Sequence, residues 1–204
     1  MSENASTAPK SSNGNEVVLI FGQAGSGKST LAKALSLHLS LRLVHPSGII
    51  RDLLAGREPN VESTIANDGY WETDEGARRL RNRLREKNPI DVQVHEILLR
   101  EVERGTVVMD TWSLPWLTAA GFRIKLEASL PVRAQRAAQR AGIPYSTALA
   151  RVVQKDNDTR DLFLRLYGFD IVKDAARFDL VINTEHVDAD EVLRLSLEAW
   201  KPQG

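Results

Sequence analysis

The order of residues 17–29, VVLIFGQAGSGKS, determines what kind of fold this chain adopts. The first five form a continuous apolar run rich in β-branched side chains, which is typical of a strand buried on both faces of a sheet. Residues 22–29 match G-x-x-x-x-G-K-[ST] without a mismatch. A helix is expected next, because Leu31, Leu35 and Leu39 recur on one helical face. A strand, a glycine-rich loop and a helix in succession predict a phosphate-binding loop (P-loop).

The residue types in this loop suit a triphosphate bound with a divalent cation. Its glycines let the backbone wrap around an anion, so that N–H groups point inward, and the helix adds the positive end of its dipole. Lys28 is expected to contact the β- and γ-phosphates, and the Ser29 hydroxyl to ligate Mg²⁺. The residues predicted to bind ATP are Gly22, Gln23, Ala24, Gly25, Ser26, Gly27, Lys28, Ser29 and Thr30.

Strand-like and helix-like patterns alternate along the rest of the chain, and this predicts right-handed crossovers and a parallel sheet. We expect an α/β fold with a five-stranded parallel sheet flanked by helices. Residues 60–89 are polar and charged, so helices there should project from the core. Further strands are expected at 41–44, 106–109, 122–126 and 178–182, and helices at 49–54, 90–104, 132–141, 145–153, 159–167 and 189–200.

Composition excludes several classes of protein. The 204 residues carry 27 Lys and Arg against 27 Asp and Glu, so the broad basic surface of a nucleic-acid-binding protein is absent. Without cysteine there is no disulfide, thiolate metal site or cysteine nucleophile. No apolar run approaches the roughly 20 residues of a membrane helix. Residues 1–15 lack a signal-peptide pattern and are interpreted as a disordered tail. We expect a cytoplasmic protein without a membrane or nucleic-acid partner, either a monomer or a weak dimer.

The position of the P-loop favours one branch of P-loop proteins. A GTPase switch would carry an N-K-x-D motif after a later strand, and the chain has none. Motor proteins are usually longer. A short chain with its P-loop close to the N-terminus favours a small-molecule kinase.

Further stretches resemble the nucleoside monophosphate kinases, most closely the archaeal-type cytidylate kinase-like proteins. Residues 47–51, SGIIR, resemble a segment whose arginine holds the acceptor phosphate. Residues 107–110, VVMD, resemble a third strand that ends in an acid near Mg²⁺, and residues 132–140, VRAQRAAQR, a helix that supplies lid arginines. Residues 166–170, LYGFD, and 178–184, FDLVINT, are similar to the signature that separates this group from adenylate and shikimate kinases.

This resemblance implies ATP- and Mg²⁺-dependent phosphoryl transfer to a nucleoside monophosphate (NMP), with CMP or dCMP as the expected acceptor. It implies a kinase domain over 16–204, with an NMP-binding insertion at about 46–104 and a lid at about 141–167. The expected catalytic residues are Lys28, Arg136 and Arg140, and the expected metal ligands are Ser29 and Asp110. Arg51, Trp112 and Arg160 are expected to contact the acceptor. Independently of the resemblance, the rings of Trp112 and Trp116, just past the third strand, either stack on a base or form a wall of the pocket.

Departures from the family pattern leave the acceptor open. The spacing from Gly48 to Arg51 is one residue short, and Trp112 follows the third strand where the family commonly has Gly-Arg. In the lid motif at 155–163, Leu162 replaces the last arginine. The alternatives are a kinase for another small acceptor (another NMP, a sugar acid or shikimate) and a non-catalytic nucleotide-binding regulator.

Three other features have two interpretations each. Arg136 and Arg140, one helical turn apart, either close on the same phosphates or are simply solvated. The basic run at 78–87 is either a solvated face or steers anionic substrates. Tyr70 and Trp71 either contact a base or do not take part in binding.

Overall fold

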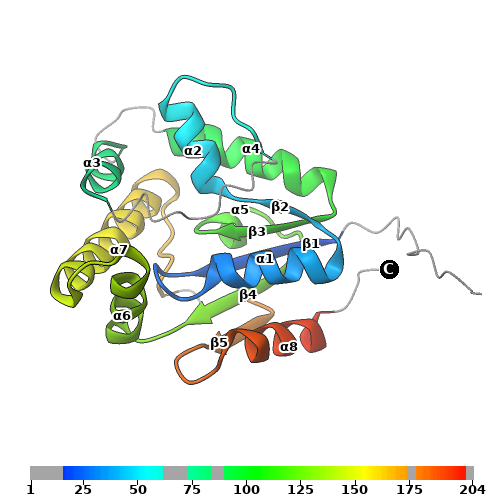
Figure 1. Cartoon of the computed structure of the whole chain (residues 1–204). Coiled ribbons are helices and arrows are strands. Elements are labelled where there is room, and N and C mark those ends of the chain that lie inside the picture. The colour runs from blue at the N-terminus through cyan, green and yellow to red at the C-terminus, as the bar shows by residue number, and fades with distance from the viewer. Residues whose placement is uncertain (1–15, 62–72, 84–89, 174–177, 201–204) are drawn as a thin grey trace, which may run out of the picture.

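A computed structural model describes residues 16–61, 73–83, 90–173 and 178–200 of the protein (Figure 1). The tail expected at 1–15, together with Tyr70 and Trp71, lies outside these residues. The strands are β1 (Val17–Gly22), β2 (Arg42–Val44), β3 (Val107–Thr111), β4 (Phe122–Glu127) and β5 (Leu180–Asn183). The helices are α1 (Lys28–Leu39), α2 (Pro46–Leu54), α3 (Asp74–Arg83), α4 (Ile90–Arg104), α5 (Leu114–Leu117), α6 (Leu130–Ala141), α7 (Tyr145–Tyr167) and α8 (Ala189–Ala199).

The five strands form one parallel sheet, as predicted, and the structure gives their order as β2-β3-β1-β4-β5. In its register Val17 pairs with Val107 and Val18 with Phe122, so β1 lies at the centre. All six residues of β1 are buried because helices cover both faces of the sheet.

Successive side chains of β1 point into two different cores. Val18 and Ile20 pack with Leu31 and Leu35 of α1 and with Val192 of α8 on one face. The other face is packed by α2, α4 and α5, through residues that include Ile49, Val94, Leu98 and Leu114. This three-layer packing holds the strand ends, and the loops that follow them, in fixed positions.

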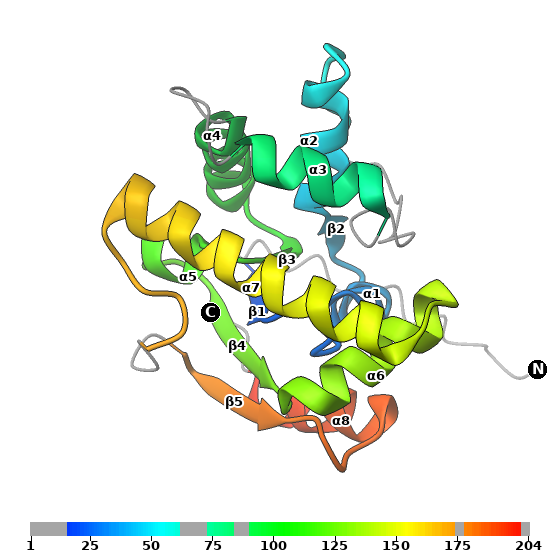
Figure 2. The same ribbon diagram turned by 90° about the vertical axis from the view of Figure 1, so that its left-hand side faces the viewer.

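Helices α6 and α7 cross the carboxyl ends of the strands, where Figure 2 shows α7 lying across the front of the sheet. Strands β2 and β3 lie on one side of β1, and strands β4 and β5 lie on the other side. The chain therefore builds the sheet first in one direction from β1 and then in the opposite direction. Ligands of open parallel sheets bind in the crevice outside the carboxyl ends at such a point. The P-loop, at the end of β1, lies there.

Most helix and strand positions agree with the sequence patterns, and α4 has the predicted bounds of 90–104. The prediction of two helices at 145–153 and 159–167 was wrong, because α7 is continuous over 23 residues. Two hydrogen bonds form within the polar middle of the helix: Gln154 donates to Asp158 at 2.6 Å, and the Thr159 hydroxyl donates to the Lys155 carbonyl at 2.7 Å. Helix α2 begins at Pro46 rather than Ile49, since proline suits the first helical turn.

The short α5 was not predicted. In the part of the charged stretch 60–89 that the structure describes, α3 is the helix present. Across the described residues, no helix combines the length and the apolar character needed to cross a membrane.

Candidate active site

The P-loop conformation depends on its glycines. Gly25 and Gly27 have φ angles of 81° and 102°, in the left-handed region. A Cβ atom on Gly25 would lie 2.6 Å from the carbonyl oxygen of Arg133, and one on Gly22 would lie 2.6 Å from that of Leu126. Glycine at both positions therefore allows β4 and α6 to approach the loop closely.

Lys28, the lysine of the P-loop motif, is buried at the first turn of α1. Its ammonium donates to the Gln23 carbonyl at 3.2 Å and lies 4.7 Å from the centre of the Trp112 ring. Burial lowers the pKa of Lys28 to about 8, and the nearby Asp110 carboxylate only partly opposes this effect. An anion at this position would restore full charge to the lysine.

Asp110, near the end of β3, is fixed by two other elements. The Ser29 hydroxyl donates to Asp110 Oδ2 at 2.7 Å, and His45 Nδ1 lies 3.0 Å from Asp110 Oδ1. Burial would raise the pKa of Asp110, but the hydrogen bonds from His45 and Ser29 and the charge of Lys28 hold it below its ordinary value. The carboxylate is therefore kept ionised and oriented beside the P-loop.

The oxygens of Ser29 and Asp110 fit a magnesium ion. Both are hard donors, and their 2.7 Å separation is close to the roughly 3 Å between neighbouring ligands of an octahedral Mg²⁺ ion. The described residues contain no cluster of three or more His, Asp or Glu side chains that could hold a metal. Two protein oxygens, with substrate phosphates and water completing the shell, are the arrangement typical of Mg²⁺ in phosphoryl-transfer sites.

The two arginines expected from the lid helix both lie beside the P-loop. Arg136 donates to the side chain and carbonyl of Thr184 at 2.9 and 2.6 Å, which ties α6 to the end of β5. Arg136 and Arg140 line one cavity with Lys28, Ser29 and Thr30. An adjoining cavity shares Gly27, Thr30 and Arg136 and has Val187 and Val192 on its apolar wall.

Arg133 and Asp156 form an ion pair beneath the P-loop that the sequence patterns did not predict. Arg133 Nη1 lies 2.6 Å from Asp156 Oδ2 and also donates to the Ala24 carbonyl at 3.1 Å. Asp156 accepts from the Gln23 side chain at 3.2 Å and from the Ala24 N–H at 3.4 Å. Burial raises the pKa of Asp156, against the effect of Arg133. The pair joins α6 and α7 to the loop. Asp156 belongs to the partial lid motif at 155–163, which was the only signal in the sequence that could have pointed to this pair.

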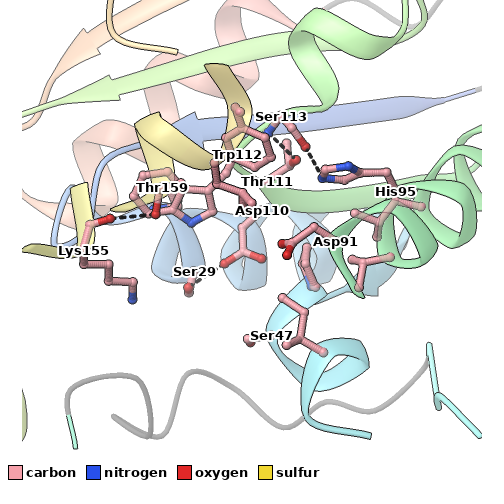
Figure 3. A pocket seen from close by; sticks show the side chains of 17 residues that line it. Ser29, Ser47, Asp91, His95, Asp110, Thr111, Trp112, Ser113, Lys155 and Thr159 are labelled. Atoms are coloured by element: carbon pink, nitrogen blue, oxygen red, sulfur yellow. Dashed lines mark hydrogen bonds between the residues drawn. The ribbon is translucent and has the colours of Figure 1, made fainter. Parts of the chain in front are cut away.

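A second cleft shares Lys28 and Ser29 with the cavity beside Arg136 and Arg140 (Figure 3). Lys28, Ser29 and Asp110 line it on the P-loop side, together with Lys155 from α7. Ser47 and Ile50 of α2, and Asp91 and His95 of α4, complete the walls. In Figure 3 the side-chain oxygens of Ser29, Asp110 and Asp91 face a common space.

Three residues are expected to contact the acceptor, and of these Trp112 is among the described residues that line the cleft, whereas Arg51 and Arg160 are not. Trp112 lines this cleft beside Lys28. Arg51 is half-buried on α2. Its neighbours Ser47 and Ile50 are among the described residues that line the cleft, but Arg51 is not. Arg160 lies outside the described lining and donates from Nε to Asp170 at 3.0 Å. The role of each of the three stays a prediction.

Trp116 belongs to the core rather than to the cleft. It packs edge-on against Phe21 and stacks on Phe169, with ring centres 4.9 and 5.3 Å apart. Phe163 and Tyr167 of α7 extend this aromatic cluster. Phe163 also lines the cleft, so the cluster joins the α7 wall of the cleft to the core.

Comparison with known proteins agrees with this geometry. The model of the cytidylate kinase-like family matches residues 17–186. A cytidylate kinase of Ignicoccus hospitalis is 34% identical over 179 residues, covering 87% of this chain and 94% of that protein. Cytidylate kinases of Pyrobaculum aerophilum and Sulfurisphaera tokodaii are 32% and 31% identical, over 89% and 90% of this chain and 91% and 94% of their own lengths.

Solved structures support the fold. An uncharacterized protein from Eubacterium ventriosum has a TM-score of 0.56 at 16% identity, and the shikimate kinase of Bacteroides thetaiotaomicron has 0.54 at 12%. Each match covers 90% of this chain and 96% of the other. At such identities the likeness shows a shared fold and nothing finer. The family match spans the P-loop, Asp110, α6, α7 and β5, and the chain belongs to the cytidylate kinase-like family.

Proposed function

We propose that this protein is an ATP-dependent nucleoside monophosphate kinase that phosphorylates CMP and dCMP, giving the diphosphate and ADP. The observation that carries the proposal is the position of Lys28 and Ser29, which line both the cavity beside α6 and the cleft beneath α7. A phosphoryl group that moves between two such spaces passes the lysine. The relatives named cytidylate kinase supply the identity of the acceptor.

We assign the cavity beside α6 to ATP. Its phosphates would lie on the P-loop, with Arg136 and Arg140 at their side, and the base would lie against Val187 and Val192 in the adjoining cavity. Ser29 and Asp110 would hold Mg²⁺, with His45 orienting Asp110. The bound ion would neutralise phosphate charge.

We assign the cleft beneath α7 to the nucleoside monophosphate. An oxygen of its phosphate forms the new bond to the γ-phosphorus while the bond from that phosphorus to the β-phosphate oxygen breaks, and ADP leaves. The attacking oxygen is already anionic, so no general base is required. Lys28, Arg136 and Arg140 neutralise the charge that spreads over the transferring group.

The insertions at about 46–104 and 141–167 would form the acceptor-binding segment and the lid. In support, α2 and α4 wall the acceptor cleft on one side and α7 covers it on the other. Closure of such a cover excludes water and so prevents wasteful hydrolysis of ATP.

A coupled assay of ADP formation across the common ribo- and deoxyribonucleoside monophosphates tests the proposal, with shikimate and gluconate included. We expect CMP and dCMP to have the highest kcat/KM, UMP to be a measurable second, and purine nucleotides to be poor. If AMP or shikimate were preferred over CMP, the protein would be a P-loop kinase for another acceptor.

A further inference from the structure

The cleft assigned to the acceptor has to bind a base, and three polar side chains of the lid, those of Asp156, Asp158 and Arg160, form contacts elsewhere. Asp156 contacts Arg133 and the P-loop. Asp158 accepts from Gln154, and Arg160 donates to Asp170. None of these three side chains belongs to the described lining of the cleft.

Asp91 is an acidic side chain that does belong to it. It lies in the first turn of α4, is only 3% exposed, and lines the cleft beside the apolar Val94 and Leu98. Figure 3 shows its carboxylate directed from α4 toward the interior of the cleft. A carboxylate has about four acceptor positions, so it can bind a ligand in addition to a protein partner.

Asp91 lines the cleft but not the cavity that contains Arg136 and Arg140. The charges that influence Lys28 are those of Asp110, Lys155, Asp156 and Arg140. Asp91 instead adds to the effect of burial in raising the pKa of the Tyr167 hydroxyl, at the C-terminal end of α7.

The wall next to Asp91 is rigid. His95, one turn further along α4, has Nδ1 2.5 Å from the Tyr167 hydroxyl and Nε2 2.8 Å from the Ser113 hydroxyl. Both ring nitrogens of this buried histidine are thus engaged by α7 and by the segment after β3. Asp91 is held on a supported helix face rather than on a loop, as a selective contact requires.

We propose that the Asp91 carboxylate reads the base of the acceptor by accepting a hydrogen bond from the exocyclic amino group of cytosine. This proposal rests on the assignment of the cleft to a nucleoside monophosphate. Uracil has a carbonyl oxygen in place of the amino group, and two acceptors facing each other leave both unpaired in a desolvated site. A polar group built to pair with the correct ligand discriminates strongly against an analogue that lacks the partner.

The test compares Asp91→Asn with the wild-type enzyme, using CMP and UMP as acceptors. The substitution keeps the shape and gives the side chain an N–H that can pair with a carbonyl. We expect the ratio of kcat/KM for CMP to that for UMP to fall by about tenfold or more, with the KM for ATP unchanged within about twofold. Glu96→Gln is the matched control, because Glu96 lies on the same helix with a side chain that is 61% exposed. It should leave the ratio unchanged.

A substrate analogue tests the same contact without altering the protein. The 5′-monophosphate of the 2-pyrimidinone ribonucleoside lacks the amino group but keeps the ring and the phosphate. Wild-type kcat/KM should fall by about tenfold or more relative to CMP. If the analogue matched CMP, or if Asp91→Asn kept the wild-type CMP preference, Asp91 would not read the base.

These failures are distinguishable from failure of the proposed function. An enzyme that phosphorylates CMP but whose preference ignores Asp91 would overturn this inference and leave the kinase assignment standing. An enzyme that phosphorylates no nucleotide would overturn the kinase assignment. Calorimetric binding of CMP and UMP would then still decide the contact: a CMP preference lost in Asp91→Asn supports it, and equal binding by the wild type overturns it.

Discussion

The cavity beside α6 and the cleft beneath α7 share Lys28 and Ser29 but are built differently. The first takes most of its lining from residues 25–30 and from one face of α6, and its charged side chains are Lys28, Arg136 and Arg140. The second draws on α2, α4, β3 and α7 and contains the acids Asp91 and Asp110. A triphosphate needs many N–H groups and positive charges, which one loop and one helix supply. Selecting a particular acceptor needs a shaped space, which requires several distant segments.

Removal of the lysine shared by both spaces should have the largest effect. Lys28→Ala should lower kcat/KM by about a thousandfold or more, since it deletes a charge directed at the transferring group. The melting temperature should stay within a few degrees, because the change also removes a buried charge. The exposed Lys33→Ala on the same helix is the control. A folded Lys28→Ala variant with near-normal turnover would contradict the proposed mechanism.

The Arg51→Ala variant tests whether binding of the acceptor can be weakened without weakening the binding of ATP. If Arg51 holds the acceptor phosphate, Arg51→Ala should raise the acceptor KM and lower kcat/KM about 30-fold or more, the effect of losing a charged hydrogen bond from a desolvated site. The KM for ATP should stay nearly constant. Arg57→Ala is the control, because Arg57 is exposed and pairs with Asp52 just beyond α2. If Arg51→Ala raised the KM for ATP and the KM for CMP equally, the cavity beside α6 and the cleft beneath α7 would not bind their substrates independently.

Gly25 tests the donor side. Gly25→Ala would place a Cβ 2.6 Å from the Arg133 carbonyl oxygen at a φ of 81°, so we expect a loss of about 1–3 kcal/mol in unfolding free energy and a raised KM for ATP. Gly168→Ala separates the two causes, because Gly168 has a φ of 74° but no atom within 4 Å of a Cβ. It should cost only about 1 kcal/mol. Equal stability losses in the two variants would mean that the close approach of α6 is unimportant.

The smallest expected effect is a pH dependence that comes from Lys28. Its pKa is lowered from 10.5 to about 8 in the folded protein, so above pH 8 the unfolded chain binds more protons than the folded one. Stability therefore rises with pH in this window, by about 1 kcal/mol between pH 7 and pH 9 for this group. Denaturant unfolding of the wild type and of Lys28→Met at both pH values measures it. The difference in stability between the two proteins should shift in favour of the wild type at pH 9, and an unchanged difference would show that the lysine is not desolvated.

The order of the residues was sufficient for the features that local rules control. The β1 strand, the P-loop and α1 are contiguous in the sequence, so this unit was predicted correctly. The alternation of strands with helices requires a parallel sheet, and this prediction was also correct. The bounds of α4 followed from its helical periodicity. Arg136 and Arg140 were predicted to share one helix face, and both line the cavity beside the P-loop.

Only the tertiary structure brought distant residues together. His45 and Asp110 are 65 positions apart, Ala24 and Asp156 are 132 apart, and no spacing rule links such pairs. The polar residues 154–158 suggested a break in α7, but hydrogen bonds within the helix and packing over the sheet keep it continuous. Asp91, which reads as an ordinary acid in the first turn of a helix, is buried in the cleft because α4 packs on the sheet with that face inward. Local propensity acts over a few residues, whereas burial is decided by which surfaces the whole chain packs together.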